Sequence, residues 1–240
     1  MKKIFAANWK LFKTPQETRA FFQAFKEVAN KATGDLVFFP SALCLEAASN
    51  SLQGTKIQFG AQNCFSQVQG AFTGENSAQT AKDMGAQYIL IGHSERRQIF
   101  GETDAMIADK VALVQSLGLI PLLCIGETLN ERESKHTYRI LETQLQLGLA
   151  KADKAKPLVV AYEPVWAIGT GKVATQEQVA ETHTDVQTIL KGLGFSAPIL
   201  YGGSVKPDNA AGLISQPHVS GFLVGGASLE VDSFIKIASV

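Results

Sequence analysis

Short apolar runs recur along the chain, and between them lie longer stretches in which apolar residues repeat at helical spacing. Most of these runs are apolar at every position, which is typical of strands buried on both faces of a parallel sheet. The pattern predicts eight strands, at Ile4–Ala7, Leu36–Phe39, Ile57–Ala61, Tyr88–Ile91, Leu119–Ile125, Val159–Tyr162, Ile199–Tyr201 and Gly221–Val224.

The amphipathic stretches between the runs predict helices, some with clear N-terminal signals. Thr14-Pro15-Gln16-Glu17 combines an N-cap residue, proline at the first helical position and an acid in the first turn. Thr175-Gln176-Glu177-Gln178 has the pattern of a capping box. Besides the helix that follows Thr14, the sequence predicts helices at Ser77–Met84, Thr103–Leu117, Lys135–Ala150 and Thr175–Leu193.

Strands that alternate with helices, with no linker or low-complexity segment, predict a single α/β domain over residues 1–240. Eight such strands favour a closed (β/α)8 barrel, a fold that reaches 240 residues undivided. An open doubly wound sheet has the same alternation and remains the alternative.

Charge and cysteine content narrow the environment and the partners. The 22 basic residues balance 22 acidic ones, so the overall field favours neither nucleic acid nor an anionic membrane. Cys44, Cys64 and Cys124 are an odd number without a Cys-x-x-Cys pair, which favours free thiols in a reducing compartment. With no apolar run long enough for a signal peptide or a membrane span, we expect a cytoplasmic location.

Glu163 stands directly after a buried strand, at the end where barrels of this kind carry their active sites. Pro164 disfavours helical backbone at Glu163 and keeps it extended. We expect burial to raise the pKa of this carboxyl toward neutrality, which suits a general base. The alternative is a glutamate paired with a structural cation.

Two more candidates follow other strands. His93 precedes Ser94 and Glu95, which start a predicted helix, and the positive end of a helix favours a neutral imidazole that donates to a carbonyl. Lys10, two residues beyond Asn8, supplies a cation for charge stabilisation. Alone, either one would more often be a structural or a solvated side chain.

Glycine pairs follow the last two predicted strands, at Gly202-Gly203 and Gly225-Gly226, and Ser204 adjoins the first. Such pairs allow close backbone approach to an anion, and they predict a phosphate site. The segment around Gly169 lies too far beyond its strand for a dinucleotide-binding turn and reads as a lid. Because metal ligands do not cluster, we expect no metal and no cofactor.

Taken together, these residues resemble the triosephosphate isomerase family from Ala7 to Leu229. The matching segments are Ala7-Asn8-Trp9-Lys10, Ala61-Gln62-Asn63, Gly70-Ala71-Phe72-Thr73-Gly74-Glu75, Ile91-Gly92-His93-Ser94-Glu95-Arg96-Arg97, Cys124-Ile125-Gly126-Glu127, Ala161–Lys172, Tyr201-Gly202-Gly203-Ser204 and Val224-Gly225-Gly226-Ala227-Ser228.

The resemblance implies a TIM barrel that interconverts dihydroxyacetone phosphate and glyceraldehyde 3-phosphate through an enediolate. The pairing of a glutamate base with a neutral histidine is the known pattern of that family. It implies that Glu163 moves the proton, that neutral His93 and Lys10 stabilise the enediolate, and that the segment from Pro164 to Ala174 closes over the ligand. By the same resemblance, the substrate-binding residues are Asn8, Lys10, Gly169, Ser204, Gly225 and Gly226, and the supporting residues are Glu95 and Ser94.

The resemblance also implies a homodimer in which the loop around Thr73 inserts beside the partner's Asn8 and Lys10. The family commonly continues Asn-Trp-Lys with Met-Asn, whereas Leu11-Phe12 follow here. A tetramer that buries Phe12 therefore stays open, as does the reactivity of Cys124.

Two other classes of function remain as alternatives. Another sugar-phosphate barrel, such as an epimerase or aldolase, would need a metal site or a Schiff-base lysine at a mid-barrel strand end, and the sequence shows neither. A catalytically inactive barrel that only binds ligand would be expected to have lost Glu163, His93 or Lys10, and all three are present.

Overall fold

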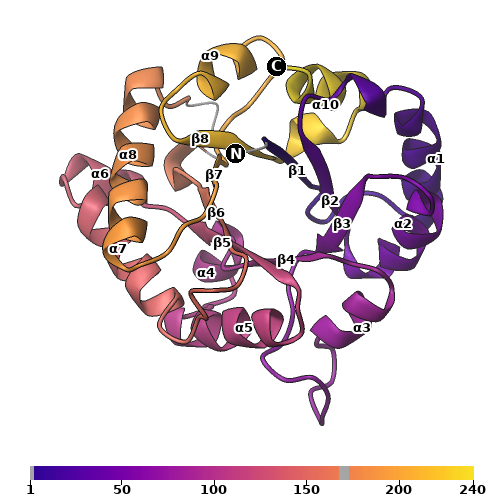
Figure 1. The fold of residues 1–240 in the computed structure, drawn as a ribbon, viewed down its shortest axis with the longest axis horizontal. Coiled ribbons are helices and arrows are strands. Elements are labelled where there is room, and N and C mark those ends of the chain that lie inside the picture. The colour runs from indigo at the N-terminus through magenta and orange to yellow at the C-terminus, as the bar shows by residue number, and fades with distance from the viewer. Residues whose placement is uncertain (1–2, 168–172) are drawn as a thin grey trace.

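The computed structural model describes residues 3–167 and 173–240. Its strands form a closed barrel in chain order, every neighbouring pair is parallel, and β1 pairs with both β2 and β8 (Figure 1). The closed barrel is confirmed and the open sheet was wrong. The strands are β1 Ile4–Asn8, β2 Asp35–Phe39, β3 Gln58–Ala61, β4 Tyr88–Ile91, β5 Ile120–Ile125, β6 Val159–Tyr162, β7 Ile199–Tyr201 and β8 Val219–Val224.

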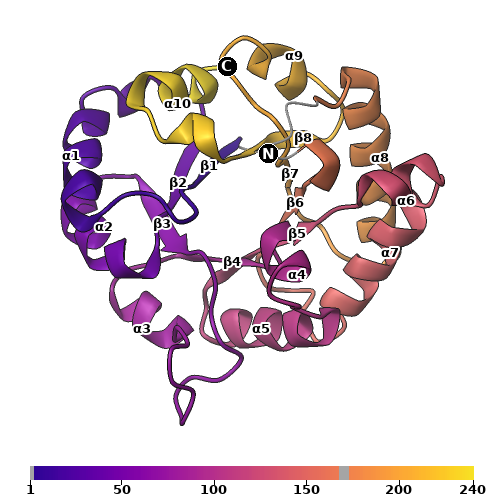
Figure 2. The ribbon, with the colours of Figure 1, turned by 180° about the vertical axis from the view of Figure 1, so that it is seen from behind.

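Helices surround the barrel on its outside, as the views from the front and from behind show (Figures 1 and 2). The α-helices are α1 Pro15–Lys26, α2 Leu45–Leu52, α3 Ala78–Asp83, α4 Ser94–Gln98, α5 Asp104–Ser116, α6 Leu129–Glu133, α7 Thr137–Gly148, α8 Gln176–Gly192, α9 Ala210–Ile214 and α10 Val231–Ala238. Single 3₁₀ turns are η1 Ala29–Lys31, η2 Ala42–Cys44, η3 Val165–Ala167 and η4 Gly226–Ser228.

The N-terminal signals predicted at Thr14 and at Thr175 are both confirmed. The Thr14 side chain accepts from the backbone amide of Glu17, while the Glu17 side chain accepts from the backbone amide of Thr14. Thr175 and Gln178 make the same reciprocal pair. The sequence pattern did not identify α2, α6, α9 or α10, which have between five and eight residues. Periodicity is a weak signal in helices this short, and the six-residue α3 is the one such helix that the pattern predicted along its length.

The apolar core has two layers, because successive strand residues point to opposite faces of the sheet. Phe5 and Ala7 of β1 join the layer between barrel and helices, while Ile4 and Ala6 join the layer inside the barrel. The inner layer consists of Ile4, Ala6, Val37, Phe39, Tyr88, Leu90, Leu122, Cys124, Val159, Ala161, Leu200 and Leu223.

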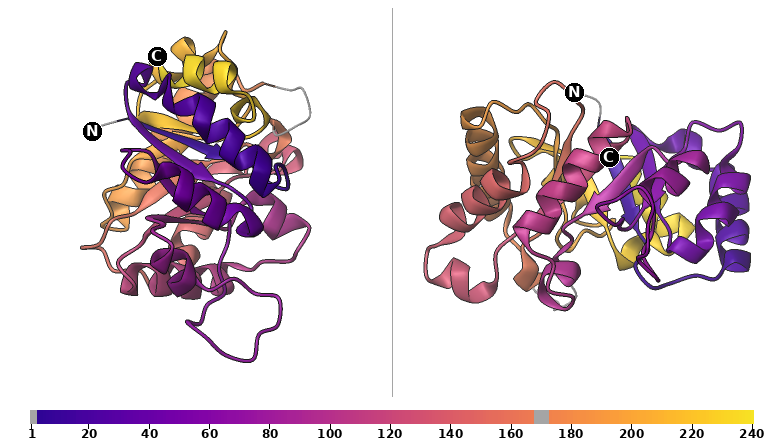
Figure 3. Two further views of the ribbon diagram at one scale, coloured as in Figure 1. Left: turned by 90° about the vertical axis from the view of Figure 1, so that its right-hand side faces the viewer. Right: turned by 90° about the horizontal axis from the view of Figure 1, so that it is seen from below.

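A long loop between β3 and α3 projects from the rim of the barrel (Figures 1 and 3). Within it the Phe65 and Phe72 rings lie 4.3 Å apart between centroids, and the backbone amide of Phe65 donates to Asn76. Among the residues that the structure describes, no helix is both long and apolar enough to cross a membrane.

Candidate active site

The alternation of inner and outer residues continues beyond the strand ends and explains which side chains meet there. Val159 and Ala161 point into the barrel, so Glu163, the residue directly after β6, takes the next inward position. The same count along β1 reaches Asn8 after Ile4 and Ala6. Pattern alone therefore brings residues from distant parts of the chain to one end of the barrel.

Glu163 is buried, and both of its carboxylate oxygens have partners. Oε1 lies 3.0 Å from Nε2 of His93, and Oε2 accepts from the backbone amide of Ser94 at 3.1 Å. The nearby Cys124 thiol also favours the charged form of this carboxylate. A Cβ on Gly202 would lie 2.8 Å from Cγ of Glu163, so only glycine leaves room for the side chain here.

His93 caps the N-terminus of α4 with its ring. Nδ1 accepts from the backbone amide of Glu95 at 3.2 Å, which requires that this nitrogen carry no proton. Nε2 then carries the proton and faces Glu163. The geometry favours a neutral imidazole that donates from Nε2.

The predicted direction of the Glu163 pKa was wrong. Burial raises this pKa, as expected, but the charge and hydrogen bond of His93 together with the Ser94 amide outweigh burial and lower it. At His93, burial lowers the pKa, and Glu163 raises it by more. Glu163 and His93 each stabilise the charged form of the other. The Glu95 amide acts in the opposite direction at His93, because it points its own proton at Nδ1 and so disfavours a second proton on the ring.

Lys10 lies opposite this pair with its backbone in the left-handed region, at φ 50°. Its backbone amide donates to Oδ1 of Asn8 at 3.0 Å, and the Gln62 amide group donates to its carbonyl oxygen at 2.8 Å. The ammonium lies 2.6 Å from Oε1 of Glu95. This contact is consistent with the supporting role that the family resemblance implies for Glu95.

One cavity of about 250 Å³ joins these groups to the glycine pairs. Asn8, Lys10, His93 and Glu163 line one part of it. The other part is lined by residues that follow β6, β7 and β8, namely Ala167, Gly202, Gly203, Ser204, Val205, Lys206, Gly225, Gly226 and Ala227.

The structure therefore brings together the candidate residues that it describes. Gly169 is the exception, because it lies outside the described residues. Among the part of the chain that is described, no group of three or more His, Cys, Asp or Glu side chains is arranged to hold a metal ion.

A buried polar cluster anchors the start of the expected lid. Oε1 of Glu127 accepts from the Trp166 indole and from the Tyr162 hydroxyl, each at 3.1 Å, and from Arg132 at 2.9 Å. Glu127 is fully buried and Trp166 belongs to η3. The cluster fixes the backbone directly after Glu163.

Sequence reasoning assigned no role to Glu127, Gln62 or Lys206. Gln62 directly follows β3 and Glu127 follows β5 by two residues. Both stand within segments that matched the family pattern, and this position was the available signal. Lys206 follows Ser204 by two residues, and nothing in the pattern distinguished it from a solvated lysine.

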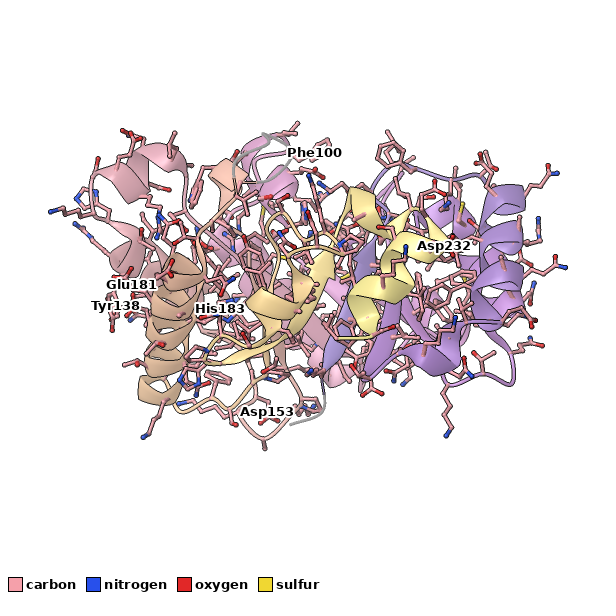
Figure 4. All side chains as sticks on the ribbon, turned by 90° about the horizontal axis from the view of Figure 1, so that it is seen from above. Phe100, Tyr138, Asp153, Glu181, His183 and Asp232 are labelled. Carbon is pink, nitrogen blue, oxygen red and sulfur yellow. The ribbon has the colours of Figure 1, made fainter. Side chains whose placement is uncertain are left out.

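A second cavity of about 520 Å³ adjoins the first, and both are lined by Asn8, Lys10 and His93. Its outer wall is apolar and exposed: Leu11 is 96% exposed and Phe12 55%, and Ile99 and Phe100 stand beside them. Figure 4 shows Phe100 at the edge of the molecule.

Comparison with known proteins gives a consistent answer. The family model of triosephosphate isomerase matches residues 3–240. A triosephosphate isomerase of Bdellovibrio bacteriovorus is 78% identical over the full length of both chains, and that of Syntrophotalea carbinolica is 46% identical over 98% of this chain and 97% of its own. The crystal structure of triosephosphate isomerase from Bartonella henselae superposes with a TM-score of 0.89 at 36% identity, covering 99% of this chain and 98% of that one.

Proposed function

The chain belongs to the triosephosphate isomerase family and is therefore an isomerase of triose phosphates, and we propose that Glu163, His93 and Lys10 carry the reaction. The observation that supports this assignment is the contact of Glu163 with His93 at the wall of the 250 Å³ cavity, with Lys10 lining the same space.

Substrate binding changes the partners of the base. Before binding, Nε2 of His93 lies 3.0 Å from the Glu163 carboxylate. In the complex, Nε2 donates instead to the carbonyl oxygen of the substrate. The carboxylate, released from His93 and enclosed with the substrate, becomes more basic because its stabilising partner is gone while its burial remains. The loss of Glu163 as a partner equally removes what raises the pKa of His93, so the imidazole stays neutral.

Proton transfer then runs between adjacent carbons. Glu163 takes the proton from C1 of dihydroxyacetone phosphate, the C–H electrons form the C1–C2 double bond, and negative charge develops on the C2 oxygen. His93 and Lys10 stabilise this enediolate by a hydrogen bond and by charge. The proton of the C1 hydroxyl then passes to the C2 oxygen by way of His93. As Glu163 returns its proton to C2, the C1 oxygen becomes the aldehyde oxygen, which yields glyceraldehyde 3-phosphate.

The other end of the cavity holds the phosphate. Ser204, Gly225 and Gly226 supply hydroxyl and backbone donors, and Gly169 completes the set in the segment from Pro164 to Ala174. Closure of that segment, anchored at Trp166 by Glu127, excludes water from the enediolate and prevents phosphate loss. Asn8 holds the substrate edge and the Lys10 backbone.

We further propose a homodimer, supported by the apolar wall around Leu11 and by the projecting loop that carries Thr73. That loop of the partner would fill the 520 Å³ cavity and reach Asn8 and Lys10. The exposed Phe12 keeps a tetramer as the second possibility. A cytoplasmic location is supported by three cysteines that are all free.

A coupled assay of the purified chain with D-glyceraldehyde 3-phosphate, in buffer containing a chelator, tests the function. We expect full turnover without added metal or cofactor. No turnover in a folded sample, or turnover that needs a metal ion, would reject the proposed chemistry.

A further inference from the structure

One cation on the cavity wall has no part in the chemistry described above. Lys206 lines the 250 Å³ cavity beside Ser204 and Gly225 and is exposed at its rim. Among the described residues its ammonium makes no ion pair, whereas the Lys10 ammonium lies 2.6 Å from the Glu95 carboxylate.

The turn that carries Lys206 is held in place by side-chain hydrogen bonds. Pro207 disfavours helical backbone at Lys206 and restricts it to extended conformations. The Asn209 side chain accepts from the Lys206 amide at 2.8 Å and donates to the Ser204 carbonyl at 3.0 Å. The Lys206 carbonyl accepts from the amides of Asn209 and Ala210. A single asparagine thus fixes the backbones of Lys206 and Ser204 relative to each other.

The charges at the cavity show why a second cation matters. A phosphate monoester carries about 1.5 to 2 negative charges near neutral pH. Along the cavity wall the Glu163 carboxylate offsets the one ammonium of Lys10, which is also paired with Glu95 outside the wall. Without Lys206 the ligand would bring a dianion to a cavity wall with no net positive charge.

We propose that Lys206 is a second phosphate-binding cation, which captures and holds the dianion at the rim and takes no part in proton transfer. The inference rests on the proposed function for the identity of the ligand. An exposed cation near a binding site raises the association rate and the affinity, and salt screens both effects.

The kinetic test compares Lys206→Ala with Lys206→Arg at low and high ionic strength. At low salt we expect Lys206→Ala to lower kcat/KM about two- to fivefold with kcat unchanged, the range that an exposed ion pair supports. Lys206→Arg restores the value, and the deficit of the alanine variant shrinks as salt rises. Lys31→Ala, which removes the same charge from the exposed η1 turn between α1 and β2, leaves kcat/KM at the wild-type value.

A binding measurement separates this inference from the function on which it rests. In calorimetric titrations with inorganic sulfate, a dianion over the whole working range, we expect Lys206→Ala to weaken binding by the same two- to fivefold. If the wild type is inactive but its sulfate affinity depends on Lys206, the proposed function fails and the cation site stands. If Lys206→Ala matches Lys31→Ala in both measurements, lowers kcat alone, or is not rescued by arginine, the inference is overturned.

Discussion

The carboxylate of Glu163 lies 3.0 Å from Nε2 of His93, so the proposed base and the proposed hydrogen-bond donor are bound to each other as they stand here. In the proposed reaction, the substrate separates them by replacing Glu163 at Nε2. This exchange ties activation of the base to binding, because the carboxylate loses a stabilising partner only when a carbonyl oxygen takes its place.

Removal of the base therefore tests the centre of the mechanism. Glu163→Ala should lower kcat by at least about 10² to 10⁴, since no other carboxylate lines the 250 Å³ cavity among the described residues. Coupled assays give the rate, and circular dichroism checks that the barrel is intact. Turnover within tenfold of the wild type in a folded variant would assign the base elsewhere.

The Glu163 and His93 pair should also leave a signature in stability against pH. The pKa of Glu163 is lowered, so its contribution is complete above the unfolded-state value of 4.5 and is lost as pH falls through the folded-state value. The pKa of His93 is raised, so its contribution is complete below 6.5 and is lost as pH rises through the folded-state value.

Consequently, the stability difference between the wild type and Glu163→Gln should be largest between about pH 4.5 and pH 6.5 and smaller on both sides. Urea unfolding at one fixed protein concentration, from pH 4 to pH 8, measures it. A difference that stays constant over this range would show that neither group has a shifted pKa.

How much of this site the sequence could predict depends on how far apart along the chain the interacting residues lie. Glu163 faces the barrel because alternation is local, and the Thr14 cap follows from residues three positions apart. The direction of the Glu163 pKa was missed because the groups that lower it, His93 first and the Ser94 amide after it, lie 69 or more positions away along the chain.

Lys10 illustrates the same limit. Its left-handed backbone is held by Gln62, 52 positions away, and no local signal marks a lysine for that conformation. Periodicity and capping fix the elements and the faces, whereas hydrogen bonds between strand ends are set only once the barrel closes.

The three thiols should be unreactive in the folded protein. Cys44, Cys64 and Cys124 are all buried. Burial raises the pKa of Cys64 to about 12, and burial together with the nearby Glu163 charge raises the pKa of Cys124 well above its ordinary range. Since the thiolate is the reactive form, a disulfide reagent at pH 7.5 should modify none in the native state and three after unfolding. Fast labelling of Cys124 in native protein would contradict this.

Leu11 tests the proposed dimer. At 96% exposure in the single chain, it would be covered by the partner's loop, and Leu11→Glu would place an unpaired charge there. Light scattering after size exclusion should give twice 25.8 kDa for the wild type and 25.8 kDa for the variant. Leu147→Glu, on the outer face of α7, is the matched control and should keep the wild-type mass. A fourfold mass for the wild type would favour the tetramer, and an unchanged mass for Leu11→Glu would exclude this surface.

Acid stability should depend on His183, a buried histidine outside the active site. It lies on the side of α8 that faces the barrel (Figure 4), with its ring centroid 5.9 Å from that of Tyr162 and 6.3 Å from that of Tyr201. Nδ1 lies 3.3 Å from the carbonyl oxygen of His218, which places the proton on Nδ1. Nε2 is buried and has no hydrogen-bond partner among the described residues, so a second proton there would have no acceptor.

Burial lowers the pKa of His183 from 6.5 to about 4. The unfolded chain therefore takes up this proton first as the pH falls, and the folded state loses about 3 kcal/mol relative to it between pH 6.5 and pH 4.

His183→Asn keeps a donor near the position of Nδ1 and cannot titrate. Its free energy of unfolding should fall by about 3 kcal/mol less than that of the wild type over this interval, whatever its stability at neutral pH. The exposed His136→Asn should follow the wild type, because its ring stays in water when the chain folds. Urea unfolding at pH 4, 5, 6 and 7 measures all three proteins, and equal losses in wild type and His183→Asn would mean that another group causes the acid sensitivity.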